Sequence, residues 1–145
     1  MFAVMLLLVL QPAYGENWKF VGTTTPDHDA YAVDMDSITD DAGFKYAWEK
    51  TTFKHSQVDS SLPAFDESLR KSANLPNDYN MYIVEKALFV YNCRNRSSQI
   101  LETIKYKNDG TILNTLHFPM DSTRWDFAVP GSIGIAEMQL VCAHR

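Results

Sequence analysis

Alternating apolar and polar residues along the first third of the chain predict short β-strands joined by turns. Residues 18–23 alternate large apolar side chains with small or polar ones, and residues 30–34 form a second short strand. Residues 44–53 carry aromatic side chains at alternate positions on one face, whereas Lys45 and Glu49 lie on the other. We therefore expect three neighbouring antiparallel strands, the third with an aromatic and a charged face.

The middle of the chain predicts a long connection followed by a central strand. Residues 55–80 are rich in Ser, Asn, Asp and Pro, and within them residues 64–71 have the spacing of a short helix. Residues 81–92 follow as a strand whose core, residues 87–91, is apolar on both faces. This pattern is typical of a strand that is covered on both sides.

The next segment predicts a β-hairpin. Residues 99–106 have strand character, and Asn108, Asp109 and Gly110 are a strong turn signal that leads into residues 111–118. These two strands bring the expected total to six. Residues 119–130 are expected to be a loop.

The C-terminal residues predict a helix. Residues 133–142 carry apolar side chains at helical spacing, with Glu137 opposite them, and Ser132 precedes them as an N-cap. The fold class we expect is α+β, a six-stranded antiparallel sheet with this C-terminal helix packed on it.

Length, composition and charge narrow the class of protein. A chain of 145 residues has room for one domain, and a hydrophobic content of 46% with 21% charged residues is ordinary for a globular protein. The formal net charge of −5 argues against nucleic-acid binding, because phosphate recognition requires a basic face. No stretch after the first ten residues is apolar enough to span a membrane.

The first residues resemble a signal peptide. Residues 1–10 are an apolar run too short for a bilayer, which needs about 20 residues. Ala13 and Gly15 are small residues at the positions that a signal peptidase reads, so we expect cleavage after Gly15 and a single domain over residues 16–145. No Lys or Arg precedes the run, and a buried N-terminal strand is the alternative. The protein is then exported, to the periplasm or the outer cell surface.

If the protein is exported, its two cysteines can form a stable disulfide. Cys93 follows the central strand and Cys142 lies at the end of the expected helix. Disulfides persist outside the cytosol, so one bridge between them is the economical interpretation, and two free buried thiols are the alternative. The bridge ties the C-terminal segment to the middle of the sheet.

No catalytic, metal-binding or cofactor-binding constellation emerges. The histidines stand apart in sequence and none lies in a nucleophile signature. Asp34 and Asp36, followed by Asp40 and Asp41, cluster as calcium ligands do, but the EF-hand spacing fails. We predict a protein that is not an enzyme, with no catalytic residues, no metal and no cofactor.

Arginines form the one local basic group on this acidic chain. Arg94 and Arg96 lie in the turn after the central strand, and Arg124 is a third candidate for the group. They predict a contact site for an acidic protein partner, with an ordinary solvated turn as the alternative. The connection over residues 55–80, which offers Phe65 and Tyr79, is the competing contact site.

Several short segments together resemble one protein family. They are residues 31–38, Asn92-Cys93-Arg94, Tyr106 followed by Gly110, and Trp125 with Pro130-Gly131-Ser132 and Cys142. In this order they are similar to the surface-adhesin protein E family. The resemblance implies a small exported bacterial protein with an antiparallel sheet and a C-terminal helix, adhering to host cells or matrix proteins. It also implies that Cys93 and Cys142 fill the family's cysteine positions, whereas Glu16 stands where a lipid-anchoring cysteine would.

The expected function is therefore an exported, non-enzymatic binding module for a host matrix or envelope protein. A periplasmic small-ligand binder, or an accessory protein of an envelope complex, is the alternative. A deep apolar pocket lined by Tyr46, Trp48 and Phe89 would favour the small-ligand function, because ligand sites are concave and mostly apolar.

Overall fold

The computed structural model describes residues 16–63 and 66–145, and its main feature is one antiparallel sheet. The expected signal segment, residues 1–15, lies outside these described residues. The strands are β1 (Trp18–Thr23), β2 (Ala30–Asp34), β3 (Thr39–Asp41), β4 (Phe44–Val58), β5 (Met81–Asn92), β6 (Ser97–Tyr106), β7 (Ile112–His117) and β8 (Asp126–Phe127). The helices are the short 3-10 helix η1 (Met35–Ser37), α1 (Glu67–Ser72) and α2 (Ile133–Ala143). Within this part of the chain, no helix is long and apolar enough to cross a membrane.

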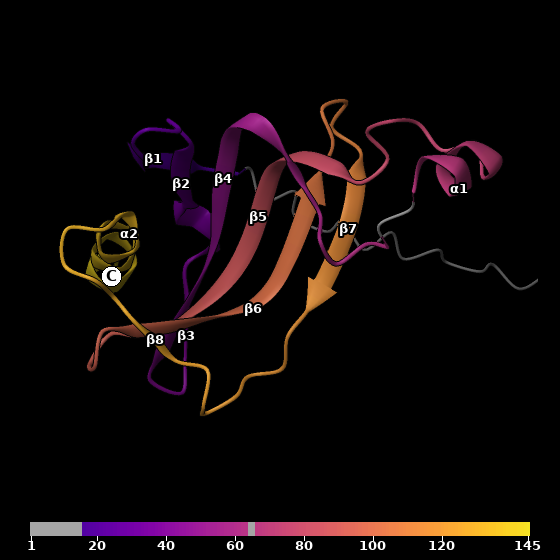
Figure 1. Ribbon diagram of the computed structural model, residues 1–145. Helices are drawn as coiled ribbons and strands as arrows, with labels where there is room; N and C mark the ends of the chain where they lie inside the picture. The colour runs from indigo at the N-terminus through magenta and orange to yellow at the C-terminus, as the bar shows by residue number, and fades with distance from the viewer. Residues whose placement is uncertain (1–15, 64–65) are drawn as a thin grey trace, which may run out of the picture.

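The order of the strands confirms the expected α+β architecture. Neighbours along the path β1-β2-β4-β5-β6-β7 pair antiparallel, so β5 lies in the interior of the sheet as its two-sided apolar pattern predicts (Figure 1). β3 pairs with the beginning of β4, and β8 pairs with the beginning of β6. These two short strands were not predicted, because two or three residues are too few to show an alternating pattern.

The long connection is shorter than the sequence predicts. β4 continues to Val58 and pairs with the beginning of β5 after an irregularity between Thr52 and Gln57. The helix within the connection begins at Glu67, with the carboxylate of Asp66 accepting a hydrogen bond from the Leu69 amide at 2.8 Å. The first two residues of the expected helix, 64 and 65, lie outside the described residues, and so does Phe65 of the competing contact site. Such an N-cap satisfies one of the free amides of the first turn.

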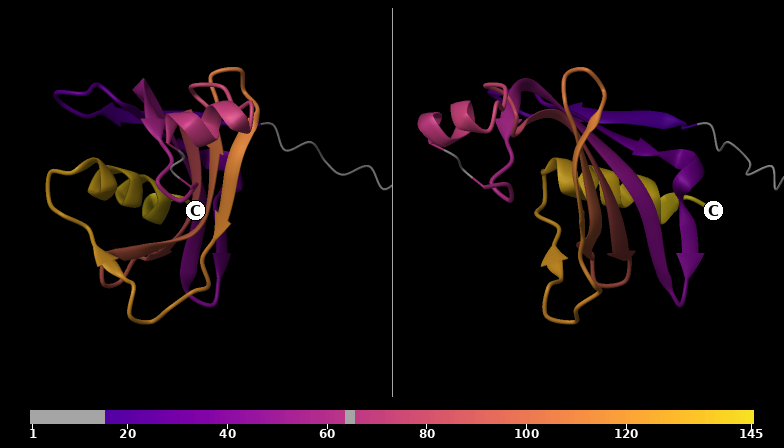
Figure 2. Two further views of the ribbon diagram at one scale, coloured as in Figure 1. Left: turned by 45° about the vertical axis from the view of Figure 1, so that its right-hand side comes forward. Right: turned by 90° about the vertical axis from the view of Figure 1, so that its right-hand side faces the viewer.

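Helix α2 lies against one face of the sheet, over β1, β2 and β4 (Figure 2). The core between them is formed by Val33, Ala47, Tyr91, Met138 and Val141. The expected N-cap is present, since the Ser132 hydroxyl accepts a hydrogen bond from the Ile135 amide at 3.2 Å. The helix therefore begins where the sequence predicts.

Strand register determines which side chains share the helix-facing side of the sheet. Val33, Glu49, Ala87, Thr103 and Leu116 pair in turn across five neighbouring strands, from β2 to β7. Paired residues on neighbouring strands point to the same face. This face is covered by α2 at the Val33 end and is open at the Leu116 end. The charged face of β4 is thus the one beneath the helix, and its aromatic face points away.

Candidate binding surfaces

The turn between β5 and β6 presents two exposed arginines. Asn92 pairs with Ser97 across the hairpin, and Arg94 and Arg96 lie between them. The Arg94 amide donates to the Asn92 side chain at 3.2 Å, and the Arg96 carbonyl accepts from the Ala128 amide at 2.9 Å. The backbone of this turn is therefore held on both sides.

A disulfide adds a covalent tie at the same turn. Cys93 and Cys142 are bonded, with a Cα–Cα distance of 5.8 Å, and the bond joins the turn to the end of α2. This confirms the predicted bridge. The turn and the helix consequently keep a fixed relative position.

Two exposed apolar side chains flank the arginine turn. Phe127 is 69% exposed and Val129 is 66% exposed, and Phe127 is the strand partner of Ser97. They alternate with Ala128, which packs against the core. We call Arg94, Arg96, Phe127 and Val129 the arginine patch. Sequence reasoning missed its apolar half, because Phe127, Ala128 and Val129 are consecutive apolar residues with no alternating pattern that would show which of them are exposed.

Arg124 does not lie in the β5–β6 turn with Arg94 and Arg96. Its guanidinium donates to the Pro119 carbonyl, lies 3.7 Å from the Asp121 carboxylate and stands 5.9 Å from the centre of the Phe118 ring. Arg124 lines a large cavity, whereas Arg96 lines a small hollow of about 120 Å³ beside α2. Arg124 and Arg96 thus line two different hollows, and Arg124 lies apart from the arginine patch.

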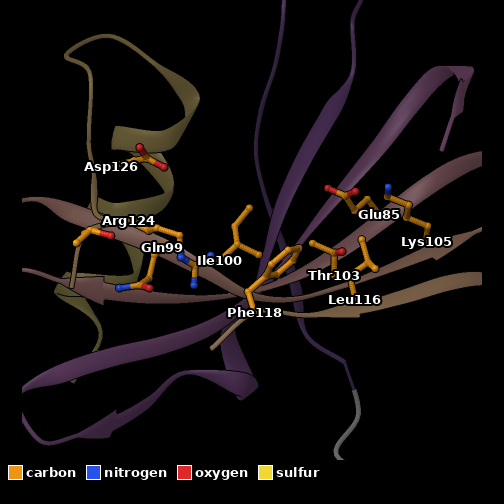
Figure 3. Close-up of a pocket in the computed structure, with 10 residues that line it drawn as sticks. Glu85, Gln99, Ile100, Thr103, Lys105, Leu116, Phe118, Arg124 and Asp126 are labelled. Carbon is orange, nitrogen blue, oxygen red and sulfur yellow. The ribbon is translucent and has the colours of Figure 1, made fainter. Parts of the chain in front are cut away.

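The large cavity, of about 620 Å³, lies beside β6, at the point where its pairing strand changes from β8 to β7. β7 pairs with β6 from Glu102 onward, and β8 pairs with Ser97 and Ser98. Between them the Gln99 side chain donates to the Asp121 carbonyl at 3.2 Å and accepts from its amide at 2.9 Å. The segment between β7 and β8 is therefore held against β6, and it forms one wall of the cavity (Figure 3).

Lys105, which lines the far end of this cavity, belongs to a buried ion pair. The Lys105 ammonium lies 2.9 Å from a carboxylate oxygen of Asp59, which is fully buried, and the Asn114 amide donates to the other oxygen at 3.0 Å. Burial opposes ionisation of Asp59, but hydrogen bonds from Ser61, Lys105 and Asn114 outweigh it and lower its pKa well below the ordinary range. The ammonium group of Lys105 is therefore paired with an ionised Asp59.

Two carboxyl groups meet beneath α2. Glu49 is 5% exposed and Glu137 is 6% exposed, so the expectation that Glu137 lies opposite the buried side of the helix is wrong. Burial raises the pKa of Glu49 well above its ordinary value, and the charge of Glu137 and a hydrogen bond to it raise it further. Burial raises the pKa of Glu137 to about 7, although the hydrogen bond from Glu49 opposes this shift.

The apolar pocket that would favour a small-ligand function is not formed by the residues named for it. Ala47 pairs with Phe89, so Phe89 shares a face with Ala47, whereas Tyr46 and Trp48 point to the opposite face of the sheet. Trp48 lines two other hollows, with Asp34 in each. Tyr46 and Trp48 therefore cannot share a pocket with Phe89.

The clustered aspartates serve local structure. Asp34 accepts hydrogen bonds from the Asn17 and Asp36 amides at 2.9 and 3.2 Å, and Asp40 pairs with Lys45 at 2.9 Å. Among the described residues, no group of three or more His, Cys, Asp and Glu side chains is arranged to hold a metal ion.

Comparison with known proteins places the fold in a family. No curated protein sequence matches the chain. Two solved structures of Haemophilus influenzae protein E match with a TM-score of 0.53 each: one is 13% identical and the match covers 92% of this chain and 94% of that chain, and the other is 14% identical with 92% and 91% covered. At this identity the likeness shows the fold alone. Residues 18–143, however, match the family model described as Surface-adhesin protein E, and the chain therefore belongs to the surface-adhesin protein E family.

Proposed function

We propose that this protein is exported and acts as a non-enzymatic binding module for an acidic protein partner, such as a host matrix protein. Family membership supports an adhesin-like surface protein. The apolar segment over residues 1–10, with small residues before position 16, supports export.

The arginine patch is the observation that carries this proposal. Arginine and aromatic side chains supply a large share of the binding energy at protein interfaces, because they combine apolar contact area with directed hydrogen bonds. In this patch both kinds of side chain stand on backbone that is held by a disulfide and by strand pairing. Little ordering entropy is lost when such a surface binds.

Replacing both arginines tests the proposal. The R94A/R96A variant should bind immobilised cell-derived extracellular matrix about tenfold or more weakly than the parent protein, since each arginine lost at an interface removes on the order of 1 kcal/mol. Its binding should also depend less on salt concentration, because fewer charge pairs remain to be screened. The melting temperature should stay nearly unchanged, since both side chains are exposed.

A charge-matched variant separates local contact from net charge. K54A/K71A removes two exposed lysines from β4 and α1, away from the arginine patch, and should leave binding nearly unchanged. Equal weakening in the two variants would contradict a local site. Unaltered binding in R94A/R96A, with loss of binding in Leu69→Ser on α1, would assign the contact to the connection between β4 and β5.

A further inference from the structure

The open half of the helix-facing side of the sheet forms a cavity that the proposed function does not use. Its middle is apolar and is lined by Ile100, Leu116 and Phe118 (Figure 3). Its two ends are polar, with Glu85 and Lys105 at one end and Arg124 and Asp126 at the other. The charges at these ends decide what kind of ligand the cavity suits.

At one end, Glu85 is an unused carboxylate. It forms no hydrogen bond or ion pair within the described part of the chain, although about half of it is buried. Its cross-strand neighbour Lys105 is bound to Asp59 at 2.9 Å. Burial raises the pKa of Glu85, the charge of Lys105 opposes that shift, and the charge of Asp59 adds to it. A cationic donor placed against Glu85 would satisfy this carboxylate.

At the other end, the guanidinium of Arg124 already has partners within the protein. Arg124 is engaged by the Pro119 carbonyl, the Asp121 carboxylate and the Phe118 ring, and Asp126 adds a negative charge beside it. An anionic ligand would therefore find no free cation in this wall. The unpaired charge that lines the cavity is negative.

We infer that this cavity binds a protonated amine carried on an apolar stem. The ammonium group donates hydrogen bonds to the Glu85 carboxylate, and the stem lies over Ile100, Leu116 and Phe118. A lysine side chain of a peptide and a free alkylamine share this chemistry. The site goes beyond the arginine patch, because it uses other residues and the opposite sign of charge.

Titration of the whole mature chain, labelled with 15N and followed by NMR, tests this inference. Three probes are added separately: n-hexylamine, the neutral 1-hexanol, and Nα-acetyl-lysine N-methylamide. Hexylamine should bind about tenfold more tightly than hexanol, the difference expected for one charge-assisted hydrogen bond. Amide shifts should cluster on β5, β6 and β7. Tighter binding of the lysine derivative than of hexylamine would identify a peptide side chain as the natural occupant, and the reverse order a free amine.

Two variants assign the effect to Glu85. Glu85→Gln should remove the preference for hexylamine over hexanol, whereas Glu102→Gln, a neighbouring carboxylate on the opposite face, should retain it. Independently of either variant, the parent protein should lose the preference as the pH falls and Glu85 becomes protonated.

Equal affinity for the two hexyl probes, an undiminished preference in Glu85→Gln, or shifts centred on Trp18 and Trp48 would overturn the inference. None of these results would bear on binding through Arg94 and Arg96, which the R94A/R96A variant tests separately.

Discussion

Glu49 and Glu137 are the least expected residues in the core. They face each other between β4 and α2, and one oxygen of each has no hydrogen-bond partner among the described residues. The hydrogen bond between them raises the pKa of Glu49 and opposes the rise in the pKa of Glu137, so Glu49 keeps its proton and donates the hydrogen bond to Glu137. A second ionisation would bury two like charges in an apolar interface, which is costly.

This pair should make the protein less stable as the pH rises. The pKa of Glu137 is about 7 in the folded protein and near its ordinary value of 4.5 in the unfolded chain, so the folded state binds more protons between these values. The stability that the protonated pair contributes is fully present below pH 4.5 and is lost as the pH rises to about 7. Glu137→Gln should remove this loss and raise the free energy of unfolding at pH 8 by about 3 kcal/mol.

Urea unfolding at several pH values measures this difference. Glu67→Gln, which removes an exposed carboxylate on α1, is the matched control and should follow the parent curve. A Glu137→Gln protein that is no more stable than the parent at high pH would show that the two carboxyls are solvated.

Among the elements, α2 depends most on a covalent tie. It contacts β1, β2 and β4 near one edge of the sheet, and the Cys93–Cys142 bond secures its last turn. In the chain-entropy model, a loop of 49 residues restricts the unfolded chain by about 4 kcal/mol. The C93S/C142S variant should lose about this much stability, because its unfolded state regains the freedom of the open loop.

Thermal unfolding of the double variant, with and without a reductant, measures this contribution. Reductant should lower the melting temperature of the parent protein towards that of C93S/C142S and leave the variant unchanged. A parent protein whose two thiols react with an alkylating agent before reduction would contradict the bridge.

The sequence predicted those helices, strands and turns that have a local signal of their own, such as a turn motif, a cap residue or a run long enough to show a period. The hairpin at residues 108–110 and the cap at Ser132 carry local signals that tertiary contacts do not override. β3 and β8 have two or three residues each and carry no detectable period. The extension of β4 to Val58 depends on pairing with β5, which only the folded chain brings about.

At the scale of the whole molecule, the arginine patch joins residues from two distant parts of the chain. Arg94 and Arg96 could be identified from their position after the central strand. Phe127 could not be placed beside them, because the pairing of β8 with Ser97 is a long-range contact. The cavity was missed for a similar reason, since Glu85, Leu116 and Arg124 come together only when β6 changes partner.

The apolar half of the patch should contribute to binding but not to stability. Phe127→Ser should weaken binding to immobilised matrix about fivefold or more, because an exposed aromatic side chain that becomes buried in a complex contributes about 1–3 kcal/mol. The melting temperature should change little, since the side chain is 69% exposed in the free protein.

Surface binding assays and differential scanning calorimetry on the same samples give both quantities. Ile112→Ser is the matched control, because Ile112 is 59% exposed on β7 and lies outside the patch. Equal loss of binding in both variants would indicate a non-specific hydrophobic effect.

The position of the disulfide also determines how the protein would carry a mechanical load. The bond closes a loop of 49 residues that contains β6, β7, β8 and most of α2, together with the arginine patch. A pull on the two ends of the chain can peel away β1, β2, β4 and β5 but cannot draw out the closed loop. About 170 Å of chain, at roughly 3.5 Å per residue, is shielded from extension in this way. A partner held at Arg94 and Arg96 would thus remain attached to a segment that stays closed while the rest of the sheet is stretched.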